Sequence, residues 1–178
     1  NVGSMGGIMA MKRHECHISP IHLLDEETGE YNISFVKKFF PNKKMVLIPG
    51  VKRLQGFIIQ QDMKKIVSDF KSLTNKEVRF INRQRGSGTR ILLDYNLKKE
   101  NIDTEKIAGY SHEANTHIAI AVAIKNDIAN VGMGVFAASK ALGLDFIPVC
   151  FECYDFLAYF ESLSDERMKK FLDVIRSK

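Results

Sequence analysis

The sequence has few cysteines, no long apolar run and no secretory signal, and each absence narrows the class of protein. Its 178 residues contain three cysteines, Cys16, Cys150 and Cys153, and an odd count argues against a disulfide framework. No apolar stretch approaches the length of a membrane span, and no charged region precedes an apolar one at the N-terminus. We therefore expect a cytoplasmic protein that makes no membrane contact.

Basic residues are numerous but are not gathered into a block. The net charge is +5 and the sequence pI is near 9.1, while the lysines occur singly and in pairs along the chain. Duplex binding usually concentrates Lys and Arg on one face. This distribution disfavours direct nucleic-acid contact and leaves a small anion as the partner that the charge suits.

The two cysteines of "CFEC", Cys150 and Cys153, have the spacing of a redox pair or of half a zinc site. No second pair with suitable spacing accompanies them, and they follow a strand-like segment instead of opening a helix, where a thiolate would be activated. We expect packing cysteines, no metal site and no required cofactor.

Apolar periodicity alternates between strands and helices along the chain. Strand patterns fall at 16–19, 45–60 (interrupted at Pro49-Gly50), 78–81, 107–110, 130–134 and 145–156. Helix patterns fall at 4–15, 33–40, 63–70, 89–100, 113–126, 135–142 and 164–177, with Ser4, Asn32 and Ser164 at three of the starts and Gly143 as a stop. This alternation predicts an α/β fold with mostly parallel sheets.

The stretch "FINRQRGSGTRILLDYNL" follows a strand pattern with glycines, hydroxyls and arginines before a helix pattern begins. Gly86 and Gly88 permit positive φ and close approach to a ligand, and Ser87 and Thr89 add hydroxyl donors beside the free amides of the helix. The glycine spacing matches neither standard nucleotide motif. An anion-binding turn is the functional interpretation; helix caps with solvated arginines are the structural one.

Two further segments place small residues at the start of a helix or the end of a strand. They are residues 4–7, "SMGG", and residues 131–134, "VGMG". Ligands in open α/β sheets collect at the carboxyl ends of strands, where all three segments are expected. None of the three is specific when taken alone.

Long runs of this sequence resemble a known family. These runs are "GSMGGIMAMKRHECHISPIHLLDEETGEYN", "RLQGF", "NRQRGSGTRILLDYNL", "GYSHEANTHIAIAVAI", "NVGMGVFAASKALGLDFIPV" and "ECYDF". They are similar to the periplasmic-binding-protein-like domain of bacterial and archaeal molybdate-linked proteins, itself similar to the solute-binding proteins for molybdate and tungstate. That domain occurs fused to helix-turn-helix regions or to molybdopterin-assembly enzymes.

The resemblance implies a two-lobed periplasmic-binding-protein type II fold with a ligand cleft and two crossover strands. It places the N-terminal part of lobe one at 1–60, a helix and crossover region at 61–76, lobe two at 77–144, and the return crossover with the C-terminal helix at 145–178. Family members usually begin with a strand and helix that precede the segment matching Asn1, and "QQDMKK" replaces their Gly-Asn-Pro. We therefore expect a fold that lacks its first strand and helix, and a homodimer stays open.

A tetrahedral oxyanion accepts hydrogen bonds and never donates them, so its site needs donors, which are expected to be amides, hydroxyls and one arginine. Each candidate side chain also has a structural alternative to ligand binding. Thr116 is equally expected to bond back into its own helical turn. A structural role is the alternative for His22 and His117, and hinge packing is the alternative for Tyr154. Among the three arginines, Arg83, Arg85 and Arg90, Arg85 is favoured as the one that contacts the ligand. Arg90 is expected to be solvated or paired. The predicted ligand-binding residues are Ser4, Met5, Gly6, His22, Arg85, Gly86, Ser87, Gly88, Thr89, Thr116, Gly132 and Tyr154.

The function expected from the residues and the resemblance is a binding module that closes around molybdate or tungstate, for sensing or molybdenum-cofactor supply. A first alternative is the effector domain of a transcription regulator that recognises a small organic carboxylate. A second is a phosphate-handling enzyme, but Asp94 has no supporting motif and no nucleophile elbow is present, so we expect no catalytic residue.

Overall fold

The computed structural model describes residues 3–25 and 27–177, and the chain forms two compact units. Unit 1 comprises residues 1–52 and 152–178, and unit 2 comprises residues 53–151. Two long strands belong to both units: β2 (Met45–Ile59) enters unit 2 after Lys52, and β6 (Asp145–Tyr159) enters unit 1 after Phe151. Compactness defines these units, and the four lobe ranges expected above stay a prediction.

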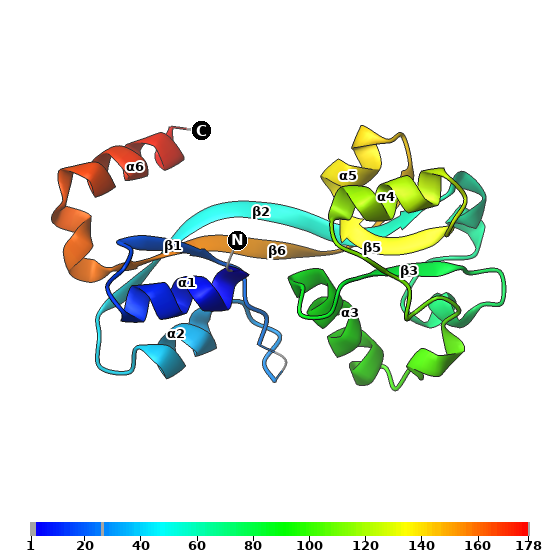
Figure 1. Cartoon of the computed structure of the whole chain (residues 1–178), viewed down its shortest axis with the longest axis horizontal. Coiled ribbons are helices and arrows are strands. Elements are labelled where there is room, and N and C mark those ends of the chain that lie inside the picture. Colours follow the sequence, from blue (N-terminus) through cyan, green and yellow to red (C-terminus); the bar gives the residue numbers. More distant parts are fainter. Residues whose placement is uncertain (1–2, 26, 178) are drawn as a thin grey trace. The chain divides into compact units, whose positions relative to one another are not determined.

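Unit 1 is a layered α/β structure. It contains α1 (Gly3–Lys12), β1 (Ile18–Ile21), α2 (Ile33–Phe39), a 3-10 helix η4 (Phe160–Ser164) and α6 (Glu166–Arg176). β1 pairs antiparallel with β6. Because successive side chains of a strand point to opposite faces, Leu157 packs with α1 and α2, whereas Ala158 packs with Met168 of α6. Figure 1 shows α1 and α2 together on one side of these strands and α6 on the other.

Unit 2 is built on β3 (Phe80–Arg83), β4 (Glu113–Ala114), β5 (Val131–Val135) and the second part of β2. Its helices are α3 (Gly88–Lys99), α4 (His117–Lys125) and α5 (Phe136–Ala141), and three 3-10 helices, η1 (Gln61–Lys65), η2 (Lys71–Thr74) and η3 (Thr104–Lys106), form its connections. The core beneath α4 includes Ile58, Ile81, Ile120 and Ala138. Figure 1 shows α3 on one side of the strands and α4 on the other.

The pairing of the strands determines where unit 2 presents its helix starts. The sheet order is β1-β6-β2-β5-β3-β4, in which β3 is parallel to both β4 and β5. Each of these three strands is followed in the chain by a helix, α3, α4 or α5. The N-termini of the three helices therefore lie at one edge of the sheet, the edge where ligands of open α/β sheets bind.

The prediction of mostly parallel strands was wrong for the two long strands and their neighbours. β1 pairs antiparallel with β6, and β2 pairs antiparallel with β5, so the sheet is mixed. β2 also continues through Pro49-Gly50, where an interruption was expected. Gly50 is needed at this point, because an added Cβ would lie 2.3 Å from the carbonyl oxygen of Tyr154.

Two short segments differ from the expected type. The helix expected at 63–70 is replaced by the 3-10 helix η1 and a turn, and the strand expected at 107–110 is a series of turns. The strand that pairs with β3 comes a few residues later, as β4. Short apolar runs are ambiguous in sequence because packing partners decide their conformation.

The expected helix caps are also corrected. The Ser4 side chain bonds to His22 from within α1, and the Asn32 side chain accepts from the Leu23 amide instead of capping α2. Asp165, not Ser164, caps α6 through the Arg167 amide. The stop at Gly143 is confirmed, since this residue follows α5 with a φ of 65°.

Cys16, Cys150 and Cys153 are half-buried, and no disulfide joins them. Among the described residues, no helix is both long enough and apolar enough to cross a membrane.

Gly109 and Gly143 both have a left-handed φ, but only at Gly109 would an added side chain also collide with a neighbour. Gly109 has a φ of 87°, and an added Cβ would lie 2.1 Å from the carbonyl oxygen of Phe80; Gly143 has a φ of 65° and open space around it. We expect Gly109→Ala to lower the free energy of unfolding by about 3 kcal/mol or more and Gly143→Ala by about 1 kcal/mol. Urea unfolding of both variants measures the difference. Equal losses would contradict the close packing of Gly109.

Candidate functional site

The turn between β3 and α3 is fixed by one hydrogen bond and one glycine. The Ser87 amide donates to the Gln84 carbonyl at 3.2 Å, and Gly86, the third residue of the turn, has a φ of 80°. A type II turn requires positive φ at this position, which explains the glycine. The Gln84 amide in turn donates to the Ala114 carbonyl, so the turn is held beside the end of β4.

Ser87 is the N-cap of α3. Its Oγ accepts a hydrogen bond from the Arg90 amide at 3.2 Å. Capping uses a lone pair of the hydroxyl and leaves its proton available to a ligand. The amides of Gly88 and Thr89 belong to the first turn, where α-helical geometry provides no acceptor. Ser87 and these two amides thus form a group of donors at one helix N-terminus, where the dipole favours an anion.

The Thr89 side chain is placed differently from the expectation of a ligand hydroxyl. Thr89 is buried, and its Oγ1 lies 3.1 Å from Nε2 of the buried Gln55. This contact occupies the Thr89 hydroxyl inside unit 2. The Thr89 amide is then the better candidate for contact with an anion.

Thr116 caps α4, the helix that follows β4. Its Oγ1 accepts a hydrogen bond from the Ala119 amide at 3.0 Å. This is the bond into its own helical turn that was expected as the alternative to ligand contact. As with Ser87, the hydroxyl proton stays available. Arg83 connects this segment to the α3 turn, because its guanidinium donates to the carbonyls of Ala114 and Asn115 at 3.3 and 3.1 Å.

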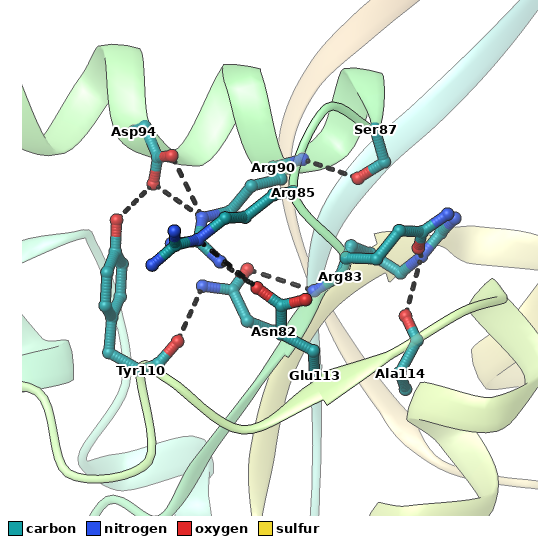
Figure 2. A network of polar contacts seen from close by, with 10 residues as sticks. Asn82, Arg83, Arg85, Ser87, Arg90, Asp94, Tyr110, Glu113 and Ala114 are labelled. Carbon is teal, nitrogen blue, oxygen red and sulfur yellow. Dashed lines mark hydrogen bonds and ion pairs between the residues drawn. The ribbon is translucent and has the colours of Figure 1, made fainter. Parts of the chain in front are cut away.

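Arg90 is the centre of a buried polar network, shown in Figure 2. Only 5% of the residue is exposed. Its Nε donates to Asp94 at 2.9 Å, its Nη1 donates to Glu113 at 3.2 Å, and its guanidinium lies 4.3 Å from the ring centroid of Tyr110. Burial, followed by the hydrogen bond to Asp94, raises the pKa of Tyr110. Arg90 is therefore paired and buried, not solvated.

Arg85 differs from Arg90 in having little contact with the protein. Its side chain is 88% exposed, and its Nε lies 3.9 Å from Glu113 Oε1. Figure 2 shows Arg85 beside the network, in which Glu113 is its ion-pair partner. Most of its donors face solvent, which leaves this arginine available to an incoming anion.

Gly132 lies inside β5, before α5 begins at Phe136. An added Cβ would be 2.7 Å from Cγ2 of Ile120 and 2.8 Å from the carbonyl oxygen of Ile81. Close packing of α4 on the sheet accounts for this glycine.

In unit 1, the predicted residues Ser4, His22 and Tyr154 lie together. Ser4 Oγ is 2.9 Å from His22 Nδ1 and also accepts from the His22 amide at 3.1 Å. The His22 and Tyr154 rings stack with centroids 4.7 Å apart. On the other side of the imidazole, Nε2 is 3.8 Å from Oε1 of Glu152, whose side chain is 2% exposed.

Met5 and Gly6, the remaining predicted residues of unit 1, lie in α1 next to Ser4. Met5 is exposed and Gly6 is half-buried. The glycine that permits close packing is Gly7, where an added Cβ would lie 1.9 Å from Ser19 Oγ.

The sequence analysis missed Glu152 and Gln55. Both are polar residues within apolar strand patterns, and both are 1% exposed. A buried charged or amide side chain in a strand needs a partner, so its position in "CFECYDF" or "RLQGF" was the available signal.

Two cavities, one in each unit, lie elsewhere. A cavity of about 690 Å³ in unit 1 is lined by residues that include His14, Cys16, Tyr159 and Phe171. A cavity of about 560 Å³ in unit 2 is lined by residues that include Gln60 and Lys140. None of the predicted ligand-binding residues lines either cavity.

Comparison with protein families gives a match over almost the whole chain. The model of the PBP superfamily domain matches residues 1–176. The Bacillus subtilis (strain 168) protein YvgK is 34% identical over 153 residues, which are 86% of this chain and 50% of YvgK. The chain thus spans about half the length of this curated relative.

Solved structures with the same fold include three binding domains. The CcmR regulatory domain of Synechocystis PCC6803, in complex with 2-PG, has a TM-score of 0.67 and 14% identity over 97% of this chain and 78% of its own. A domain described as the substrate-binding domain of a molybdenum ABC transporter from Clostridium difficile has a TM-score of 0.64 and 14% identity over 99% of this chain and 77% of its own. A Vibrio cholerae ABC-type phosphate transport receptor has a TM-score of 0.63 and 14% identity over 100% of this chain and 81% of its own. These similarities show a fold of the periplasmic-binding-protein type II kind.

Two arginines that are close in sequence should differ in their effect on stability. Arg90→Met leaves Asp94 and Glu113 without their buried cation, and we expect it to lower the free energy of unfolding by about 2 kcal/mol. Arg85→Met removes an exposed contact and should change it by less than about 0.5 kcal/mol. Chemical unfolding of both variants tests this, and an equal loss would show that Arg90 is not the centre of the network.

Proposed function

This chain belongs to the PBP superfamily and is a ligand-binding domain, and we propose that its ligand is a tetrahedral oxyanion, molybdate or tungstate. The observation that carries the proposal is the N-terminus of α3, where the Ser87 hydroxyl and the amides of Gly88 and Thr89 form one donor group. A fully deprotonated oxyanion accepts hydrogen bonds only, so a group of donors matches its chemistry.

The charges of two acids near this donor group are offset by two arginines, which supports an anion site. Arg90 holds both Asp94 and Glu113 within hydrogen-bonding distance. Their negative charge is therefore offset by a buried guanidinium, and Arg85 adds an exposed positive charge. Thr116 supplies a second capping hydroxyl at the carboxyl end of β4, next to β3 in the sheet.

The biological role that we propose is sensing or molybdenum-cofactor supply in the cytoplasm. Similarity to the molybdenum transporter domain and to the phosphate receptor supports an oxyanion ligand. A fused or neighbouring helix-turn-helix or molybdopterin-assembly domain would be the partner, and the additional length of YvgK leaves room for such a segment in a relative. No cofactor and no catalytic residue are part of the proposal.

A second candidate ligand is a small organic carboxylate, bound in a regulator's effector domain. Similarity to the CcmR regulatory domain, solved with 2-PG, favours it. A carboxylate also accepts hydrogen bonds only, so the α3 donor group suits it as well. The two candidates differ in the shape of the anion, and a panel of ligands separates them.

Isothermal titration calorimetry of the chain against molybdate, tungstate, sulfate, phosphate and glutamate tests the proposal. We expect binding of molybdate or tungstate and no binding of glutamate. Binding of glutamate alone would select the carboxylate alternative, and binding of none of the five would overturn the oxyanion proposal.

Ser87→Ala should weaken molybdate binding about tenfold or more, because a hydrogen bond to a charged group is removed. The variant also loses a helix cap, so Asp165→Ala, which removes the cap of α6 in unit 1, is the matched control. The control should lose stability and keep its affinity for molybdate. Unchanged affinity in Ser87→Ala would remove this hydroxyl from the site.

A further inference from the structure

We propose that Glu113 is an internal competitor of the anion: its carboxylate pairs with Arg85 before an anion binds and gives this arginine up when one does. The inference rests on the proposed function, in which Arg85 and the α3 donor group contact an oxyanion. All the residues that it uses belong to unit 2. It assigns to Glu113 a control over affinity that requires no contact with the ligand.

One carboxylate oxygen of Glu113 lies between two arginines. Its Oε1 is 3.2 Å from Nη1 of Arg90 and 3.9 Å from Nε of Arg85. Figure 2 shows the carboxylate together with both guanidinium groups. The contact with Arg90 is a hydrogen bond, whereas the contact with Arg85 is too long to be one and is an ion pair only. Arg85 is therefore the arginine that Glu113 holds less firmly.

The release of Arg85 costs little. Its side chain is 88% exposed, and exposed ion pairs contribute weakly to stability because water screens them and both side chains lose freedom. Glu113 is not left without a cation, since it keeps its hydrogen bond to the buried Arg90. An incoming anion thus replaces Glu113 as the partner of Arg85, and one contact between opposite charges is exchanged for another.

Arg85 is attached at a place from which the donor group is within the same turn. It is the second residue of the turn that begins at Gln84 and ends at Ser87, directly before Gly86. Rotation about its own side-chain bonds redirects the guanidinium, while the backbone amides and the capping hydroxyl stay in place. The exchange of partners therefore needs no rearrangement of the turn.

The carboxylate of Glu113 opposes the anion in two ways. Arg85 has to leave it before a ligand gains this arginine, and Arg90 then offsets the charges of both Asp94 and Glu113 with a single positive charge. The negative charge that remains repels an anion nearby. Removal of the Glu113 charge should therefore strengthen anion binding, the opposite of what is expected for a residue that only supports the fold.

Glu113→Gln tests this directly, because the amide oxygen still accepts a hydrogen bond from Arg90 while the charge is lost. We expect the variant to bind molybdate about two- to fivefold more tightly than the unmodified chain, in line with the strength of an exposed ion pair. Isothermal titration calorimetry of the two chains measures the ratio, and thermal unfolding verifies that the variant is folded.

A double-mutant cycle with Arg85→Gln shows whether Glu113 acts through Arg85. If the two residues pair before binding, the gain from Glu113→Gln should be clearly smaller when Arg85→Gln is also present, because only the repulsion of the anion is then relieved. The stability of the fold alone would not couple the affinity of one variant to the presence of the other.

Asp94→Asn is the matched control. Asp94 is the other carboxylate that Arg90 holds, and its Oδ1 also accepts the Tyr110 hydroxyl. Within the described part of the chain, Asp94 forms no ion pair with Arg85. Any change in molybdate affinity caused by Asp94→Asn should therefore be the same with and without Arg85→Gln.

The outcomes separate this inference from the proposed function. Molybdate binding that is unchanged or weaker in Glu113→Gln, or a gain of equal size with and without Arg85→Gln, would overturn the role of Glu113 and leave the oxyanion proposal intact. Failure of both the unmodified chain and Glu113→Gln to bind molybdate would overturn both.

Discussion

The parallel pairing of β3 with β4 and β5 is the constraint on which the candidate site depends. Parallel strands have their carboxyl ends at the same edge, and each of these strands continues into a helix. The capping hydroxyls Ser87 and Thr116 are consequently presented at neighbouring positions of one edge. If β3 and β4 were antiparallel, the two helix starts would lie at opposite edges and could not serve one ligand.

Arg90 makes this edge suitable for an anion by acting on its neighbours. Asp94 and Glu113 lie close to the donor group of α3, and without a buried cation their charges would oppose an anion. The guanidinium pairs with both and stacks on Tyr110, so its own charge is not available to a ligand. The buried Arg90 thus has a structural role, whereas the exposed Arg85 is the arginine that we propose for the ligand.

Local signals predicted most of the elements, and the residues that failed are those whose partners are distant in the sequence. The glycine and serine of the α3 turn could be predicted because turn geometry and helix capping act within a few residues. The roles of Ser4 and Asn32 could not, because their side chains bond to His22 and Leu23 across a loop. The burial of Arg90 and Thr89 depends in the same way on Glu113 and Gln55, which come from other strands.

The hydroxyls of the two units differ in a way that residue type alone does not reveal. Ser87 and Thr116 accept from amides of their own helices, and an amide never takes a proton from a hydroxyl, so both remain donors at every pH. Ser4 Oγ instead lies 2.9 Å from an imidazole nitrogen, whose role as donor or acceptor depends on the tautomer of the ring. Three chemically similar side chains thus form two classes, capping hydroxyls in unit 2 and a hydroxyl shared with an imidazole in unit 1.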